Sequence, residues 1–165
     1  MEPAAEDAPP WSGVRRADAR DAERVAALWT ELSAHHARLD GRHALRPGAQ
    51  REIGRLVHAD LTDPDALVLL YEQQGSACGL CMTRIQHAPP IHRETQRAEI
   101  GELFVRESAR RRGIGRALVD RAFEWLRGRG VDRVVVRVGA SNAQGQAFWR
   151  GIGFAAFVDV LERRL

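Results

Sequence analysis

A glycine-containing turn between a strand and a helix constrains the fold of this chain more than any other feature. Residues 98–105 are rich in apolar side chains and predict a strand. Apolar residues then recur every three or four positions over about 114–128, which predicts a helix with one buried face. Gly113 and Gly115 lie in the turn that joins them. Because a strand is predicted again at 133–138, we expect a right-handed parallel crossover in a mixed α/β domain.

The remaining elements fit one domain without internal repeats. At 165 residues the chain is long enough to bury a core of its own, and 44% of its residues are hydrophobic. We expect one domain at 13–165, preceded by a disordered tail at 1–12 that is acidic and rich in proline and alanine. The other predicted elements are a strand at 14–17, helices at 21–36, 48–61 (with Pro47 in its first turn) and 143–151, strands at 66–73 and 77–87, and a last strand or split pair of strands at 154–161.

Composition argues against several classes of protein. No apolar run reaches the roughly 18 residues that span a bilayer, and the N-terminus lacks the basic and apolar regions of a secretory signal. We therefore expect a cytoplasmic protein with no membrane partner. All 25 basic residues are arginine, which excludes a P-loop lysine and a Schiff-base lysine. The net charge of +3 suits an anionic ligand, but acids are interleaved with the arginines and no RNA-binding aromatic motif is present, so we expect no nucleic-acid partner.

Cys78 and Cys81 form a lone C-x-x-C motif. A zinc site of this type needs a second pair of ligands, which the chain lacks. On a strand at 77–87, a spacing of three residues puts the two thiols on opposite faces of the sheet. We expect two small buried residues and no metal site.

The turn itself has the character of an anion-binding site. Gly113 and Gly115 carry no side chains, so backbone N–H groups can close around a ligand. A helix that begins near Ile114 leaves its first amides unpaired and partially positive, and three preceding arginines add donors suited to phosphate oxygens. A Walker A motif would need a lysine, and a Rossmann turn would need a third glycine where this chain has Leu118. The turn therefore favours a pyrophosphate bound in another kind of fold.

At this point the residues resemble the GCN5-related N-acetyltransferase (GNAT) family. The family's phosphate loop, [Arg/Gln]-x-x-Gly-x-[Gly/Ala], is matched at every fixed position by Arg110-Arg111-Arg112-Gly113-Ile114-Gly115. Asn142, the pair Phe148-Trp149 and the closing Gly153-Phe154 are similar to its second motif. The resemblance covers about 14–161. It implies a splayed central sheet of about six to seven strands with flanking helices.

The same resemblance implies a binding site for acetyl-CoA as co-substrate. The pantetheine arm would lie in a gap between the strands at 98–105 and 133–138, and the pyrophosphate would lie on the amides of the turn. The residues implied in binding are Leu103, Phe104 and Val105 for the pantetheine, Arg110, Arg111, Arg112, Gly113, Ile114, Gly115 and Arg116 for the pyrophosphate, and Asn142 and Phe148 beside the CoA arm.

The reaction that follows is direct attack of a primary amine on the acetyl thioester. Freeing an amine of pKa near 10 at neutral pH costs about 4 kcal/mol, so a carboxylate that accepts the proton, often through water, assists the attack. Glu102 and Glu99 are the candidates, and their spacing of three on a strand predicts opposite faces. We favour Glu102 because it is nearer the expected thioester. The alternative role for each is a half-exposed glutamate that pairs with an arginine. A backbone N–H near Phe104 or Val105 would hold the oxyanion.

One position departs from the family pattern. Many members have a tyrosine that protonates the leaving thiolate, where this chain has Trp149, and an indole N–H is not a useful acid. A CoA-binding sensor without activity is therefore an alternative to an enzyme. The acceptor amine, a small molecule or peptide, is not identified by any motif in the variable segments 34–50 and 86–97, and His35, His36 and His43 are more typical of a solvated helix end. A homodimer is plausible for the family, although we find no stretch that encodes one.

Overall fold

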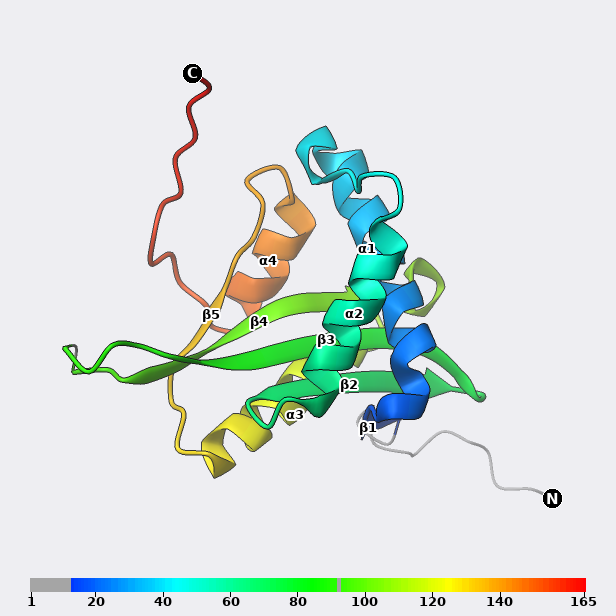
Figure 1. The fold of residues 1–165 in the computed structure, drawn as a ribbon, viewed down its shortest axis with the longest axis horizontal. Helices are drawn as coiled ribbons and strands as arrows, with labels where there is room; N and C mark the ends of the chain where they lie inside the picture. The colour runs from blue at the N-terminus through cyan, green and yellow to red at the C-terminus, as the bar shows by residue number, and fades with distance from the viewer. Residues whose placement is uncertain (1–12, 92) are drawn as a thin grey trace.

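The structure is a computed structural model that describes residues 13–91 and 93–165. The tail expected at 1–12 lies outside the described residues. One five-stranded sheet, in the order β1-β2-β3-β4-β5, carries helices on both faces (Figure 1). The strands are β1 (Val14–Arg16), β2 (Ala66–Gln73), β3 (Ser76–His87), β4 (Gln96–Val105) and β5 (Val134–Val136), and the helices are α1 (Ala22–Leu39), α2 (Ala49–Thr62), α3 (Ile114–Gly128) and α4 (Ala143–Gly151).

The topology agrees with the expected mixed α/β class. Strands β1 to β4 are antiparallel to their neighbours, and β4 and β5 are parallel. Because α3 connects β4 to β5, the segment that most constrained the sequence interpretation forms a strand-helix-strand crossover with a parallel pair, as expected. No helix in the described part of the chain is both long and apolar enough to cross a membrane.

Two apolar cores lie on opposite faces of the sheet. On one face, α1 and α2 pack against β2, β3 and β4 through residues that include Leu28, Val57 and Leu80. On the other face, α3 packs through Ile114 and Leu118, and α4 adds partly buried aromatic residues. The apolar stripes predicted for the helices are therefore the faces that meet the sheet.

Two helix boundaries differ from the expectation. Helix α1 continues to Leu39, three residues beyond the predicted end, and stops where Asp40 takes an extended backbone. Helix α2 begins after Gly48, whose φ of 79° is left-handed. The prediction that Pro47 lies in the first turn of α2 is wrong, because the left-handed Gly48 separates it from the helix.

Cys78 and Cys81 are free and buried, as expected, but they do not lie on opposite faces. Both belong to the core under α3. The pairing of β2 with β3 jumps from Tyr71↔Gly79 to Glu72↔Ala77, so Cys78 is the extra residue of a β-bulge. A bulge interrupts the alternation of side chains, which is why a spacing of three returns to the same face. Among the described residues, no group of His, Cys, Asp or Glu could hold a metal ion.

The last predicted strand, at 154–161, is absent. These residues have no regular secondary structure, and the sheet therefore has five strands instead of six to seven. In Figure 1 the C-terminal segment leads away from the helices and the sheet. Its residues are rich enough in Phe, Val and Leu to favour a strand, but a strand forms only where another strand pairs with it.

Candidate functional site

The sheet opens beside the second half of β4. Strand β4 is paired with β3 as far as Val105, but its pairing with β5 ends at Ile100↔Val136. Residues 101–105 therefore have no pairing on the β5 side, where the family resemblance implies a gap between these two strands. Leu103, Phe104 and Val105, the residues expected along a pantetheine arm, all lie in this part of β4.

A β-bulge at Gly101 changes the geometry of the two candidate carboxylates. In the register of the two strands, Glu99 lies opposite Arg84 and Glu102 lies opposite Met82. Two residues of β4 separate the two glutamates but only one residue of β3 separates their partners, so Gly101 has no partner on β3. The side chains of Arg84 and Met82, two apart on β3, share a face, and so do their partners. The prediction that Glu99 and Glu102 face opposite ways is wrong, and both line one pocket.

This pocket has a volume of about 170 Å³ and lies on the face of the sheet that α1 and α2 cover. It combines an apolar floor with three carboxylates and one guanidinium group. Arg84 pairs with Asp60 and also with Asp63, at the end of α2. The lining residues are Trp29, Asp60, Leu67, Val68, Met82, Thr83, Arg84, Gln86, Glu99, Gly101 and Glu102.

Glu102 and Glu99 differ in their burial and in the groups that bind their carboxylates. Burial raises the pKa of Glu102 to about 7, the nearby carboxylates of Asp60 and Glu99 act in the same direction, and a hydrogen bond from Trp29 opposes them. Glu99 instead accepts a hydrogen bond from Gln86 at 2.6 Å and pairs with Arg137 at 3.2 Å. Glu102 has the properties of a proton acceptor near neutral pH, whereas Glu99 is committed to its partners.

The turn before α3 has the backbone of an anion-binding site. Arg111 and Gly113 have left-handed φ values of 61° and 79°, and turns with alternating backbone handedness direct successive N–H groups to one side. Gly113 caps α3 without a side-chain hydrogen bond, so the first amides of the helix are open to a ligand. Ile114 is buried in the core and can offer only its amide.

The arginines of the turn are not equivalent. Arg110 donates from Nε to the Val105 carbonyl at 2.9 Å and thereby fixes the corner after β4. Arg116 pairs with Asp120 at 3.0 Å. Arg111 and Arg112 are exposed, and neither has an acidic partner within ion-pair distance among the described residues. These two side chains are the ones available to a phosphate.

Helix α4 comes close to the same turn. A Cβ atom added to Gly115 would lie 3.5 Å from the nearest carbon atoms of the Phe148 ring, so the ring lies directly beside this glycine. Asn142 caps α4 by accepting a hydrogen bond from the Gly145 amide at 2.9 Å, which leaves its NH₂ group free to donate. The structure thus brings Phe148 to the turn, and Asn142 begins the helix that carries Phe148.

Trp149 lies in an aromatic cluster. Its ring packs edge-to-face against two phenylalanines, with centroid distances of 5.1 Å to Phe148 and 5.0 Å to Phe154. The chain's one tyrosine, Tyr71, packs in the core under α3, on the other face of the sheet from the Glu102 pocket. Neither residue is placed as an acid beside Glu102.

His35, His36 and His43 form a separate cluster at the end of α1. The ring centroids of His35 and His36 are 6.1 Å apart, and those of His36 and His43 are 5.9 Å apart. Burial lowers the pKa of both His35 and His36. None of the three lines the Glu102 pocket.

Sequence reasoning missed part of the pocket wall. Nothing in the local pattern marked Trp29, Asp60 or Arg84 as pocket residues. A signal did exist, since Asp60 lies in the last turn of the helix predicted at 48–61 and Asp63 follows just after it, and cations are favoured at such an end. Such acids need a cationic partner, which Arg84 supplies.

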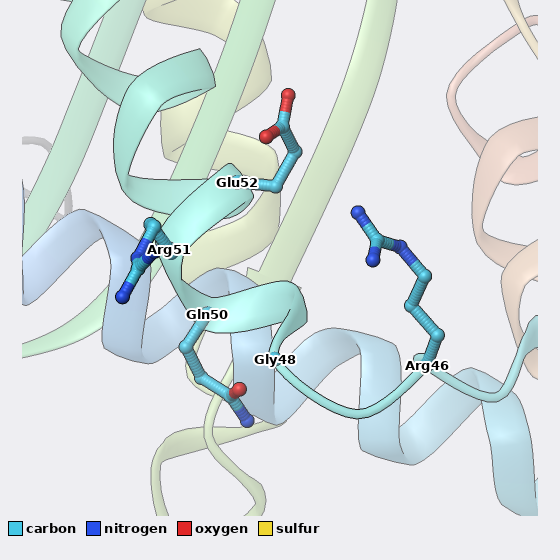
Figure 2. A pocket seen from close by; sticks show the side chains of 5 residues that line it. All are labelled: Arg46, Gly48, Gln50, Arg51 and Glu52. Carbon is cyan, nitrogen blue, oxygen red and sulfur yellow. The ribbon is translucent and has the colours of Figure 1, made fainter.

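A larger hollow of about 540 Å³ lies at the start of α2. Figure 2 shows Arg46 and Glu52 reaching toward the same side, while Gln50 and Arg51 point away from it. The hollow is an open surface formed by Arg46, Gly48, Gln50, Arg51 and Glu52, and no residue of the turn or of β4 lines it. The smaller pocket, with its apolar floor and partly buried carboxylates, is the better candidate for a site.

Solved structures similar to this chain share its fold. The tetramutant of the BH1408 protein from Bacillus halodurans has a TM-score of 0.81 at 21% identity, with 92% of this chain and 99% of that one covered. An aminoglycoside N-acetyltransferase, AAC(6')-Iy in complex with CoA, has a TM-score of 0.75 at 18% identity over 92% and 93% of the two chains. A predicted acetyltransferase with acetyl-CoA from Clostridium acetobutylicum has a TM-score of 0.76 at 15% identity over 92% and 94%.

Curated relatives match part of their own length. A mycothiol acetyltransferase from Cellulomonas flavigena is 33% identical over 122 residues, which are 67% of this chain and 35% of that protein. A mycothiol acetyltransferase from Beutenbergia cavernae is 50% identical over 56 residues, 34% of this chain and 19% of that protein. This chain therefore spans about a third or less of the mycothiol acetyltransferases that it matches. The model of the acetyltransferase (GNAT) family matches residues 27–154, which contain the β4 gap, the glycine turn and α4. The chain belongs to the GNAT family.

Proposed function

We propose that this protein is an acetyl-CoA-dependent N-acetyltransferase that transfers the acetyl group to a primary amine by direct attack. The observation that carries the proposal is Glu102, a partly buried carboxylate with a pKa of about 7, in a pocket beside the opening between β4 and β5. Membership of the family, and relatives named as acetyltransferases, support the same reaction.

The cofactor would be held by the groups that the fold leaves unpaired. The β4 backbone at 103–105 adjoins the gap, and the amides at 111–116, with the Arg111 and Arg112 side chains, suit a pyrophosphate. Bound there, acetyl-CoA supplies an acyl thioester next to the pocket. Asn142, through its free NH₂ group, and Phe148, next to Gly115, would line the CoA arm.

Glu102 would remove the proton that prevents attack by an ammonium group. It can accept this proton directly or through one water molecule, at a cost that its pKa of about 7 keeps small near neutrality. The amine nitrogen then bonds to the carbonyl carbon, a β4 backbone N–H around Phe104 or Val105 holds the oxyanion, and the carbon–sulfur bond breaks. Since Trp149 is no acid, the thiolate would receive, through water, the second proton that the nitrogen loses as the amide forms.

The charges of the pocket favour a cationic acceptor. Asp60, Glu99 and Glu102 outnumber the single guanidinium of Arg84, and the Trp29 ring adds a surface that suits an ammonium group. The names of the similar proteins mention mycothiol and aminoglycosides. They differ in acceptor and select neither for this chain.

A panel of amines with acetyl-CoA, followed by the release of free thiol, tests the proposal. We expect release with at least one cationic amine. We expect Glu102→Gln to slow release by about 100-fold or more, while the control Glu99→Gln keeps most of the rate because its partners are structural. Equal losses in the two variants would argue against Glu102 as the base.

The second candidate is a CoA-binding sensor, favoured by Trp149 standing in an aromatic cluster instead of a tyrosine. It predicts CoA binding with no thiol release for any amine of the panel. Calorimetric titration with CoA beside the panel separates the two functions.

A further inference from the structure

Trp29 brings a hydrogen-bond donor to the wall of the Glu102 pocket. Of the residues that line this pocket, Trp29 is the one that α1 contributes. Its indole N–H donates a hydrogen bond to the Glu102 carboxylate, which joins α1 to β4. Both side chains are partly buried. Because water is partly excluded there, this hydrogen bond is stronger than a similar one at the surface.

Other polar groups of the pocket have partners of their own. In the described part of the chain, the charged groups that share the pocket with Glu102 are Asp60 from α2, Arg84 from β3 and Glu99 from β4. Arg84 binds two aspartates at the end of α2, and the Gln86 amide donates to Glu99 at 2.6 Å. Trp29 is thus the neutral donor that the structure joins to Glu102.

Helix α1 is anchored to the end of β4 two residues after Trp29. Arg106, which follows β4, donates to the Glu31 carboxylate from Nε at 2.9 Å and from Nη2 at 2.6 Å. Its Nη1 donates to the Ala77 carbonyl at 3.0 Å. A two-point contact between a guanidinium and a carboxylate fixes orientation as well as distance. Since the Trp29 ring also packs against the core under α1, the indole has a defined place relative to the strand that carries Glu102.

The indole leaves one oxygen of Glu102 for the chemistry. An indole N–H can only donate, and a carboxylate has two oxygens. The oxygen that accepts from Trp29 is engaged, so a proton taken from an ammonium group bonds to the other oxygen. The electron pair of the broken N–H bond stays on the nitrogen and becomes the lone pair that attacks the thioester. A carboxylate held in this way keeps its accepting oxygen in one orientation.

We propose that Trp29 is a positioning residue for the acetyl transfer, whose indole N–H holds one oxygen of Glu102 so that the other oxygen takes the proton of the acceptor amine. The inference rests on the proposed function of Glu102 as the base. It adds a residue of α1 to a reaction otherwise assigned to β4 and the turn before α3.

Nuclear magnetic resonance tests the contact without any turnover. Protein labelled at the indole nitrogen gives a signal for each of its four tryptophans, and the signal that is missing from Trp29→Phe belongs to Trp29. We expect this signal to shift as the pH passes through about 7 in the unaltered protein and to stay constant in Glu102→Gln. A Trp29 signal that does not shift, or that shifts equally in Glu102→Gln, overturns the proposal.

Kinetics test the positioning. Trp29→Phe removes the donor, whereas benzothienylalanine at position 29, in which sulfur replaces the N–H, keeps the size of the ring. In both variants we expect kcat to fall about tenfold, and the step of kcat/KM near pH 7 should move to higher pH because the ionised carboxylate loses its donor. The analogue should keep KM, since the ring surface remains.

The matched control is Trp125→Phe, the same substitution at a partly buried tryptophan of α3 on the other face of the sheet. It should keep both kcat and the pH step. An analogue-bearing enzyme with unchanged kcat and pH step overturns the proposal, even if Trp29→Phe does not fold. Absence of thiol release for every amine overturns the proposed function and with it the role in transfer, whereas a Trp29 signal independent of Glu102 overturns this inference alone.

Discussion

Glu102 is partly buried beside Asp60 and Glu99, and this environment favours its protonated form. The same burial that suits a base near neutral pH leaves a charge in a poor dielectric when the base is ionised. Catalysis and stability at this residue should therefore change in opposite directions with pH.

The pH dependence of kcat/KM is the first prediction. With an acceptor whose amine has a low pKa, so that its own ionisation does not interfere, the rate of the unaltered enzyme should rise with pH through about 7 as Glu102 loses its proton. In Glu102→Gln this step should disappear. A step near pH 7 that persists in the variant would assign the titration to another group.

Stability should show the reverse trend. The folded pKa of Glu102, about 7, lies above its ordinary value of 4.5, so the folded state binds this proton more tightly than the unfolded state. Its contribution is fully present below pH 4.5 and is lost as the pH rises through 7, at a cost of up to about 3 kcal/mol. Glu102→Gln should thus melt higher than the unaltered protein at pH 8 and nearly equally at pH 4.5. Thermal denaturation at the two pH values measures the difference, and an unchanged Tm at pH 8 would contradict it.

At the scale of elements, the glycine turn and α3 act together. Gly113 is left-handed, and its amide and those after it begin the helix. A Cβ atom added to Gly113 would have no other heavy atom within 4 Å, so the energetic cost of a substitution there comes from the left-handed backbone alone.

Gly113→Ala should lower the free energy of unfolding by about 1 kcal/mol, because alanine is strained at positive φ. It should also weaken CoA binding by about tenfold or more, since the amides that face the ligand move. Gly128→Ala, at the other end of the same helix and without positive φ, is the control: it should leave CoA binding unchanged and should not lower the free energy of unfolding, because alanine favours the helix. Chemical denaturation and calorimetry provide the two measurements, and equal CoA affinities in the two variants would contradict the role of the turn.

Elements with strong local signals could be predicted from the sequence, and features set by pairing could not. The bounds of α4 and β2 were predicted exactly, because Asn142 caps the one and turns bound the other. The sheet faces predicted for the side chains of Cys78 and Glu102 were wrong, because each depends on a bulge that can be recognised only when two strands are aligned. Asp60 and Arg84 were missed because they are 24 residues apart and meet only in the fold.

At the scale of the whole molecule, the two cores flank a sheet whose β5 is held to β4 by three residue pairs. The candidate CoA gap lies along this weak junction. A ligand bound there should join the two parts of the sheet and stabilise the folded protein as a whole.

Saturating CoA should therefore raise the Tm, by an amount that corresponds to about 2.7 kcal/mol at a concentration 100 times its Kd. Acetyl-pantetheine, which lacks the pyrophosphate, should give a much smaller shift at the same concentration. The double variant Arg111→Ala, Arg112→Ala should reduce the CoA shift and its dependence on salt. The matched control Arg121→Ala, on the exposed side of α3, should leave both unchanged, and a similar loss in both proteins would argue against the turn as the phosphate site.

The bulge at Gly101 separates Glu99 and Glu102 by one residue more than β3 can match. The two carboxylates therefore share the pocket side of the sheet although they are three positions apart in the sequence. Deletion of the single codon for Gly101 would remove the extra residue and leave Glu99 and Glu102 two positions apart, and regular alternation would keep both on the pocket side. A reading-frame-neutral loss of three nucleotides would thus shorten β4 by one residue while the same two acids still face the pocket.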